Sequence, residues 1–223
     1  MMKQKLAILG TLLLALSLAA CSGMRRIPEK TGSVGRCNDG YLVGGVQLPS
    51  SGEIIVLEPQ FAYGTPTLVH SIEAAAADMR ANYPDTVSMV VGHLSRPEGG
   101  PLRPHKSHQS GRDFDVAYYA KDNQLIRGFV DMRRGKLDVA KTWEFIELML
   151  EHADVQYILM DWDVQKIMYE ELRLFESEWK LRKLFQYPRK PGNRTGVIRH
   201  APSHHNHMHI RIHCPDDDWF CLD

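Results

Sequence analysis

Two short segments of the chain hold residues whose types and spacing suit them to binding a metal ion. Residues 105–115 read HKSHQSGRDFD, and residues 204–209 read HHNHMH. A catalytic zinc ion typically takes three protein ligands, with histidine and carboxylate among them, and keeps a fourth position for water. A histidine from a loop, an aspartate from the strand that follows and a histidine from a second strand could supply those ligands. The chemistry that such a site supports is metal-assisted hydrolysis.

Both segments continue into stretches that alternate like β-strands, and this alternation decides which side chains can meet. In residues 112–120 the apolar residues point to one face, and Asp113 and Asp115 point to the other. In the second segment His207 and His209 share a face, because side chains in a strand repeat every two residues. We therefore expect two strands to present their polar faces to a metal.

Each of these residues also has a simpler interpretation. A single histidine such as His108 is more often a surface residue than a ligand, and Asp113 and Asp115 could belong to a turn or a salt bridge. The histidine-rich tract 204–209 could bind metal adventitiously. The presence of both segments in one exported chain favours a functional zinc site over these alternatives.

The beginning of the chain indicates export. Lys3 and Lys5 precede an apolar run over residues 6–20, which is short for a membrane span and typical of a signal peptide. The run ends in Leu-Ala-Ala followed by Cys21, which resembles the lipobox of bacterial lipoproteins. The resemblance implies removal of residues 1–20 and acylation of Cys21; an ordinary signal that leaves a free Cys21 is the alternative.

The polar segment after Cys21 predicts a tether between membrane and domain. Residues 21–36 are rich in glycine and polar residues, and residues 37–223 look like one continuous domain. Ser22 stands where an aspartate would favour retention in the inner membrane. By resemblance to enterobacterial sorting, we expect a periplasmic lipoprotein anchored in the outer membrane.

Composition excludes some classes of function. The 27 basic and 27 acidic residues balance, whereas a dedicated nucleic-acid binder usually has a basic excess. We therefore expect no nucleic-acid partner. The sequence says nothing about the oligomeric state.

Hydrophobic periodicity predicts how the two segments are positioned. Strands are expected over residues 87–91, 112–120, 155–160 and 207–213, and helices from Thr65 to Pro84, over 139–152 behind an Asp138 cap, and over most of 164–185. Because strands and helices alternate without a regular βαβ rhythm, we expect an α+β fold. Its core would be a small antiparallel β-sheet that carries the zinc site and is flanked by helices. In an oxidising compartment we expect Cys214 and Cys221 to form a disulfide, which leaves Cys37 either free or paired differently.

The two segments resemble a known family. Residues 107–115, with Ser-His-Gln-x-Gly-x-Asp-x-Asp, and residues 204–209, with His-x-x-His-Met-His, are similar to the penicillin-insensitive murein endopeptidases. These belong to the lysostaphin-type and D-alanyl-D-alanine metallopeptidases. The similarity extends over most of residues 37–223. It implies that these residues form a zinc metallopeptidase domain.

The resemblance implies a role for each residue. It implies Zn²⁺ bound by His108, Asp115 and His209, with His207 as the general base. His204 and His105 would lie beside the site, where either one, when protonated, could stabilise negative charge on the substrate. Spacing alone could not separate the roles of the two strand histidines, because paired histidines sometimes both bind zinc.

The resemblance also implies the substrate. The implied substrate is peptidoglycan, cut at the D-alanyl–diaminopimelyl cross-link. The membrane, as a second partner, is expected from the lipobox-like segment that ends at Cys21. Two alternatives remain open: a D,D-carboxypeptidase or dipeptidase that trims free peptide ends, and a non-catalytic envelope lipoprotein that binds zinc or murein.

Overall fold

The domain begins earlier than the sequence suggests. The computed structural model describes residues 31–223. The expected signal peptide, the lipidation of Cys21 and the first part of the tether lie outside the described residues. The end of the expected tether forms strand β1 (Gly32–Arg36), which pairs with β2 (Asp39–Val43) in an antiparallel hairpin. The ordered domain therefore includes five residues that the sequence analysis assigned to the tether.

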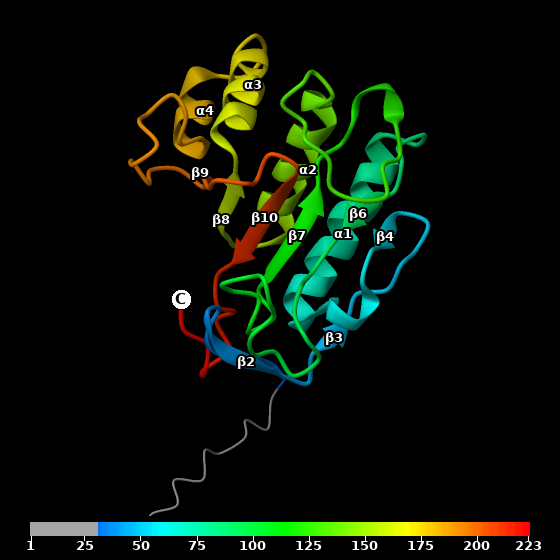
Figure 1. Ribbon diagram of the computed structural model, residues 1–223, viewed down its shortest axis with the longest axis vertical. Helices are drawn as coiled ribbons and strands as arrows, with labels where there is room; N and C mark the ends of the chain where they lie inside the picture. Colours follow the sequence, from blue (N-terminus) through cyan, green and yellow to red (C-terminus); the bar gives the residue numbers. More distant parts are fainter. Residues whose placement is uncertain (1–30) are drawn as a thin grey trace, which may run out of the picture.

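A six-stranded sheet forms the centre of the molecule (Figure 1). Its strands, in spatial order, are β4 (Ile54–Val56), β6 (Met89–Val91), β7 (Asp113–Ala117), β10 (His207–Ile212), β8 (Val155–Met160) and β9 (Ile198–His200). The four inner strands are antiparallel to one another, as expected. The two outer pairs, β4 with β6 and β8 with β9, are parallel, which the sequence analysis did not foresee.

Helical crossovers explain why the sheet is mixed. Parallel neighbours need a long connection, usually a helix, whereas antiparallel neighbours can be joined by a short turn. Helix α1 (Pro66–Asn82) lies between β4 and β6 in the chain. Helices α3 (Trp162–Leu172) and α4 (Glu178–Leu184) lie between β8 and β9. Two further short strands, β3 (Val46–Gln47) and β5 (Tyr63–Gly64), and the 3-10 turns η1 (Pro59–Phe61) and η2 (Lys121–Asn123) complete the domain.

Two helices cover one face of the sheet and leave the other free for the site. Helices α1 and α2 (Val139–His152) lie side by side behind β7 and β10 in Figure 1. Both begin as the sequence predicts, since the side chains of Thr65 and Asp138 accept hydrogen bonds from the backbone N–H three residues on. The sheet residues that face these helices are almost fully buried: Phe114, Val116, Ile158, Met208 and Ile210. The alternate residues of β7 and β10 therefore point to the opposite face.

The segment over residues 164–185, expected to be mostly helical, forms two helices. Helix α3 ends near Arg173, and Ser177 begins α4 by accepting a hydrogen bond from the backbone N–H of Lys180. Within residues 31–223, no helix combines the length and apolar character that crossing a bilayer requires.

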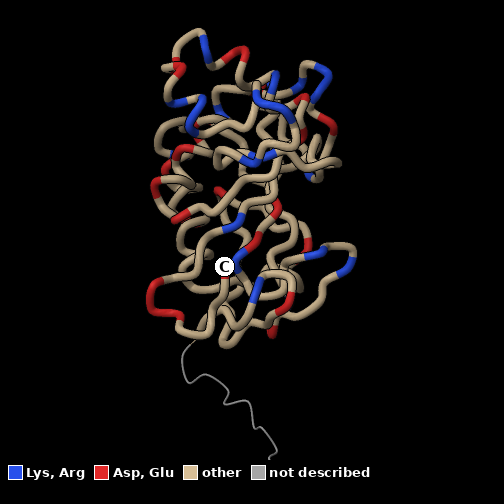
Figure 2. The backbone as a smooth tube through the Cα atoms, turned by 90° about the vertical axis from the view of Figure 1, so that its left-hand side faces the viewer, with Lys and Arg blue, Asp and Glu red and all other residues tan. Residues whose placement is uncertain are grey.

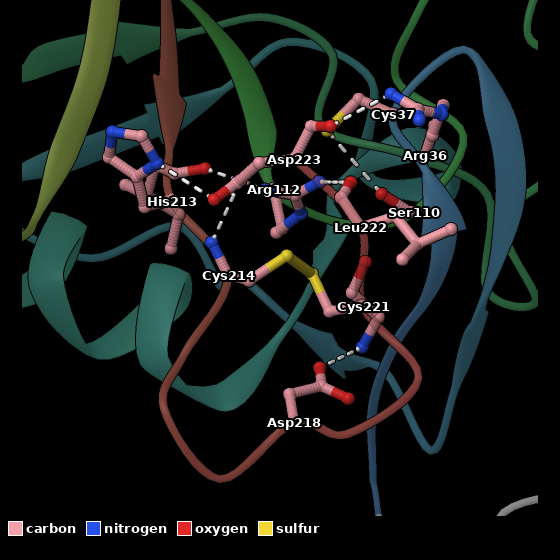
Figure 3. The surroundings of a disulfide bond; sticks show 12 residues. Arg36, Cys37, Ser110, Arg112, His213, Cys214, Asp218, Cys221, Leu222 and Asp223 are labelled. Carbon is pink, nitrogen blue, oxygen red and sulfur yellow. Dashed lines mark hydrogen bonds and ion pairs between the residues drawn. A yellow bond between two sulfur atoms is a disulfide. The ribbon is translucent and has the colours of Figure 1, made fainter.

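A disulfide and a buried arginine fasten the C-terminal residues to the domain (Figure 3). Cys214 and Cys221 are bonded, as predicted. Arg112 is buried and donates to the carbonyl of Leu222 at 2.7 Å and to the Asp223 carboxylate at 2.6 Å. Cys37, whose pairing the sequence leaves open, is free and buried, and burial raises the pKa of its thiol to about 12, so it is an unreactive core residue.

We expect the double variant Cys214→Ser/Cys221→Ser to lose about 2 kcal/mol of unfolding free energy, because the bond closes a short loop and restricts the unfolded chain only modestly. Urea unfolding measures the loss. A reducing agent should shift the wild-type midpoint by a similar amount and leave the variant unchanged. Equal stability of variant and wild type would contradict a stabilising role for this bond.

Candidate active site

Two neighbouring strands and one loop bring the predicted ligands together. Strands β7 and β10 are antiparallel, and His209 stands directly opposite Asp115 in their register. His108 comes from the loop before β7, where it has a positive φ of 65°. Gly111 also has a positive φ, and a Cβ atom there would lie 2.8 Å from the Leu42 side chain and 3.0 Å from the backbone nitrogen of Thr65. The motif glycine is therefore required for the loop to turn His108 toward the strands.

The three side chains meet at distances that suit one metal ion. The Nε2 atom of His108 lies 3.0 Å from Nδ1 of His209 and 3.4 Å from Oδ1 of Asp115. The distance between His209 Nδ1 and Asp115 Oδ1 is 3.1 Å. Tetrahedral ligands bound to zinc at about 2.0–2.2 Å are roughly 3.3 Å apart. All three residues are at most 5% exposed. The nitrogen and oxygen donors therefore fit a zinc ion without rearrangement.

Hydrogen bonds fix the tautomer of each imidazole. His108 donates its Nδ1–H to the carbonyl of Leu94 at 2.6 Å, which leaves the Nε2 lone pair free. His209 donates its Nε2–H to Oδ1 of Asp113 at 2.9 Å, so that in its neutral form the lone pair is on Nδ1. The two free lone pairs are the ones that face Asp115. Histidine ligands of metals are usually oriented by this kind of hydrogen bond.

Asp113 connects the loop, β7 and β10. Its Oδ2 accepts the backbone N–H of His108 at 3.0 Å, and its Oδ1 accepts Nε–H of Arg211 at 2.6 Å as well as the hydrogen bond from His209. Burial raises the carboxyl pKa, but the hydrogen bond and charge of His209 and the neighbouring cations outweigh it and hold the pKa far below its usual range. Asp113 thus stays ionised. The sequence analysis placed this residue on the correct face and allowed it a salt bridge, which it forms with Arg211, but gave it no role in orienting His209.

Two carboxylates flank His209 and favour its protonated form. Burial lowers its pKa, but the hydrogen bonds to Asp113 and Asp115 outweigh burial and raise the pKa to about 9. A metal ligand must be deprotonated at its donor atom. Metal binding at this site therefore displaces one proton near neutral pH.

His207 lies beside the ligands and is oriented as a proton acceptor. Its Nδ1–H donates to Oδ1 of Asn206 at 2.7 Å, and its Nε2 faces Asp115 Oδ1 at 3.8 Å. The ring stacks on Phe129, with centroids 4.7 Å apart and an angle of 16° between planes. Burial lowers the pKa of His207 to about 4, although the Asp115 charge acts in the opposite direction. The imidazole is therefore neutral at pH 7, with a free lone pair toward the site.

His105 and His204 lie close to this centre. His105 Nδ1 is 3.6 Å from Asp115 Oδ2, and one donor atom each from His105, His108 and Asp115 lie within 4.8 Å of one another. The rings of His204 and His207 are 4.9 Å apart. Burial lowers the pKa of both flanking histidines, that of His105 to about 4. The sequence analysis expected one of them to act as a cation, whereas burial favours neutral imidazoles. The N–H of each neutral ring is already engaged, because His204 donates its Nδ1–H to the Pro202 carbonyl at 2.9 Å and His105 donates its Nε2–H to Nδ1 of His93 at 2.8 Å.

Three residues of this centre were missed by sequence reasoning. His93 bonds to Nε2 of His105 through its Nδ1 at 2.8 Å, and its own Nε2 meets the Glu58 carboxylate at 2.8 Å. Phe129 comes from the loop before α2. They come from separate connections, outside either motif, so spacing offered no signal that could have linked them to the site.

Residues 33–223 match the family model described as penicillin-insensitive murein endopeptidase. The chain belongs to this family. The penicillin-insensitive murein endopeptidase of Citrobacter koseri is 27% identical over 245 aligned residues, which cover 100% of this chain and 82% of the relative. Those of Escherichia coli K12 and Shigella dysenteriae serotype 1 are 26% identical with the same coverage. As a member of the murein endopeptidase family, the chain is a peptidase.

For this member of the murein endopeptidase family, we expect Asp113→Asn to lower zinc affinity about 10- to 100-fold, because His209 would lose the charged acceptor that orients its Nδ1. Competition with a chromogenic zinc chelator measures the change. Asp78→Asn is the matched control, since Asp78 also bonds a histidine, His152, but on the surface. Unchanged zinc affinity in a folded Asp113→Asn variant would contradict the role assigned to this carboxylate.

Proposed function

We propose that this chain is a zinc-dependent murein endopeptidase that hydrolyses the D-alanyl–diaminopimelyl cross-link of peptidoglycan. The proposed ligands are His108, Asp115 and His209. The observation that carries the proposal is the convergence of their three donor atoms within 3.4 Å, with the second nitrogen of each imidazole already engaged. His105 is the weaker candidate for a ligand, because its Nδ1 is 3.6 Å from Asp115 and its ring is drawn toward His93.

The residues around the ligands have roles that follow from their hydrogen bonds. Bound zinc would lower the pKa of a water and polarise the scissile carbonyl. His207 Nε2 would take the proton of the attacking water and return it to the leaving amine, since its Nδ1–H is held by Asn206. His105 and His204 would carry a further N–H toward the negative charge that develops on the carbonyl oxygen only when protonated, because the N–H of each neutral ring is engaged by His93 and by the Pro202 carbonyl.

The proposed setting is the periplasmic face of the outer membrane. The relatives carry the name murein endopeptidase, which supports peptidoglycan as the substrate. Lipidation at Cys21 would hold the domain within reach of the wall, and β1 begins eleven residues after that cysteine, at Gly32. An extended chain covers about 3.3–3.6 Å per residue, so the connection would span up to roughly 40 Å.

Digestion of purified muropeptides tests the proposal. The zinc-loaded protein is incubated with cross-linked muropeptide dimers, and the products are weighed by mass spectrometry. We expect monomers to appear, to disappear after chelation and to return when zinc is restored. Loss of a terminal D-alanine from dimers that stay cross-linked would show a carboxypeptidase instead, and intact dimers with bound zinc would show a non-catalytic binder.

A further inference from the structure

The face of the sheet that carries the metal ligands continues over β8 and β9. Tyr157 of β8 stands opposite Arg211 of β10 in the register, and its ring lies nearly parallel to that of His209, with centroids 6.2 Å apart. Arg199 of β9 stands beside Leu159 of β8. A hollow of about 410 Å³ opens next to these side chains and is lined by Tyr157, Leu159, Gln186, Arg194, Arg199 and His200, with the loop at 191–192.

Two guanidinium groups share the ring of Tyr157, but only one has a carboxylate partner. The guanidinium carbon of Arg211 is 4.9 Å from the ring centroid and that of Arg199 is 5.5 Å from it. Arg211 is neutralised by Asp113, with 2.6 Å between Nε and Oδ1. Among residues 31–223, the only hydrogen bond of the Arg199 side chain runs from its Nε to the carbonyl of Gly196 at 2.9 Å. Its two terminal NH₂ groups therefore remain available to an anion.

The lining of the hollow strengthens this local charge. It includes Arg194 and His200 in addition to Arg199, and no aspartate or glutamate. A second hollow of about 360 Å³ shares Tyr157 and Leu159 with the first and extends to His209. Figure 2, which faces the β9 side of the molecule, shows basic and acidic positions interspersed at its helical end. The unpaired cation, rather than an overall basic surface, is what distinguishes the hollow, and a positive, partly enclosed site concentrates anions.

We infer that Arg199 binds a free carboxylate of the substrate peptide while the scissile bond of the same peptide lies at the metal centre. This inference rests on the proposed function. Guanidinium groups bind carboxylates through two parallel N–H···O bonds, and Arg199 has both terminal nitrogens free for them. Tyr157 lies between Arg199 and His209. The centroid of its ring is 5.5 Å from the guanidinium carbon of Arg199 and 6.2 Å from the centroid of the His209 ring. A substrate carboxylate about two or three residues from the scissile bond could therefore reach Arg199 while that bond lies beside His209. Murein peptides, whose acidic residues keep free carboxylates, have this chemistry.

The test compares two substrates and three proteins. The substrates are a cross-linked muropeptide dimer with free carboxylates and the same dimer with its carboxylates converted to amides. The proteins are the zinc-loaded wild type, Arg199→Gln and the control Lys183→Gln, which removes a cation that lies 5.3 Å over the ring of Trp179, outside the hollow. Zinc content and melting temperature are measured for each protein, and KM and kcat are measured for each protein with each of the two substrates.

We expect the wild type and Lys183→Gln to favour the acidic dimer about 10- to 100-fold, mainly through KM, as the loss of a charge-assisted bond predicts. Arg199→Gln should lose this preference while it cleaves the amidated dimer as the wild type does. Equal kcat/KM of the wild type on both substrates would overturn the inference without any variant. So would an Arg199→Gln variant that keeps the preference, or one that loses the same factor on both substrates.

Failure of the proposed function gives a different result. If the zinc-loaded wild type cuts neither dimer, the carboxylate site is measured by calorimetry with uncross-linked muropeptide monomers, acidic and amidated. The same preference, now in Kd, and its loss in Arg199→Gln would support the carboxylate site alone. Equal Kd values for the two monomers would overturn it.

Discussion

Replacing His209 by alanine is expected to abolish stoichiometric zinc binding and to lower peptidase activity by about 1000-fold or more. His209 supplies the donor atom that lies 3.0 Å from His108 Nε2 and 3.1 Å from Asp115 Oδ1. Without it, two protein donors remain where a catalytic zinc ion needs three. Zinc contributes several kcal/mol of transition-state stabilisation, and each 1.36 kcal/mol is tenfold in rate.

Metal analysis and muropeptide digestion of the same preparation measure both effects. His213→Ala is the matched control, because His213 follows β10 and bonds a carboxylate, Asp223, at the surface. It should bind zinc and cleave as the wild type does. Full zinc occupancy in His209→Ala would show that another donor, with His105 the nearest candidate, completes the shell, and the ligand assignment would be wrong.

The parts of the fold that the sequence predicts are those whose causes are local. Helix α2 follows from its Asp138 cap and its apolar periodicity, and β10 follows from strict alternation. Strand β9 was missed because it is three residues long and becomes a strand only by pairing with β8 across two intervening helices. The parallel edges of the sheet have the same origin, since strand direction depends on the crossover rather than on the strand's own residues.

The candidate site divides in the same way. Alternation alone places Asp113 and Asp115 on one face of β7, and His207 and His209 on one face of β10. It does not predict that these two strands are neighbours, with both faces on the same side of the sheet. That they are is a consequence of the register between β7 and β10, in which His209 meets Asp115. The different surroundings of His207 and His209 likewise come from tertiary contacts: His209 lies between two carboxylates, whereas His207 lies between Asn206 and Phe129.

Because His207 and His209 have different surroundings, replacing His207 is expected to reduce catalysis without a loss of zinc. In His207→Ala we expect kcat to fall about 100- to 10,000-fold, the range that general acid–base catalysis contributes. Zinc content should stay at the wild-type level, because the side chain is held by Asn206 and Phe129 and none of the three proposed donor atoms depends on it.

His205→Ala tests whether this effect is specific to residue 207. Its imidazole belongs to the same tract, and the hydrogen bond that His205 accepts, from the backbone N–H of Met132 to its own backbone carbonyl, does not involve the side chain. Activity close to wild type in His205→Ala, beside a zinc-loaded and inactive His207→Ala, separates proton transfer from metal binding. If His207→Ala instead lost its zinc, both histidines of the strand would be ligands, and the proton acceptor would have to be sought in His105 or His204. If His207→Ala kept both its zinc and the full rate of cleavage, His207 would not be the general base.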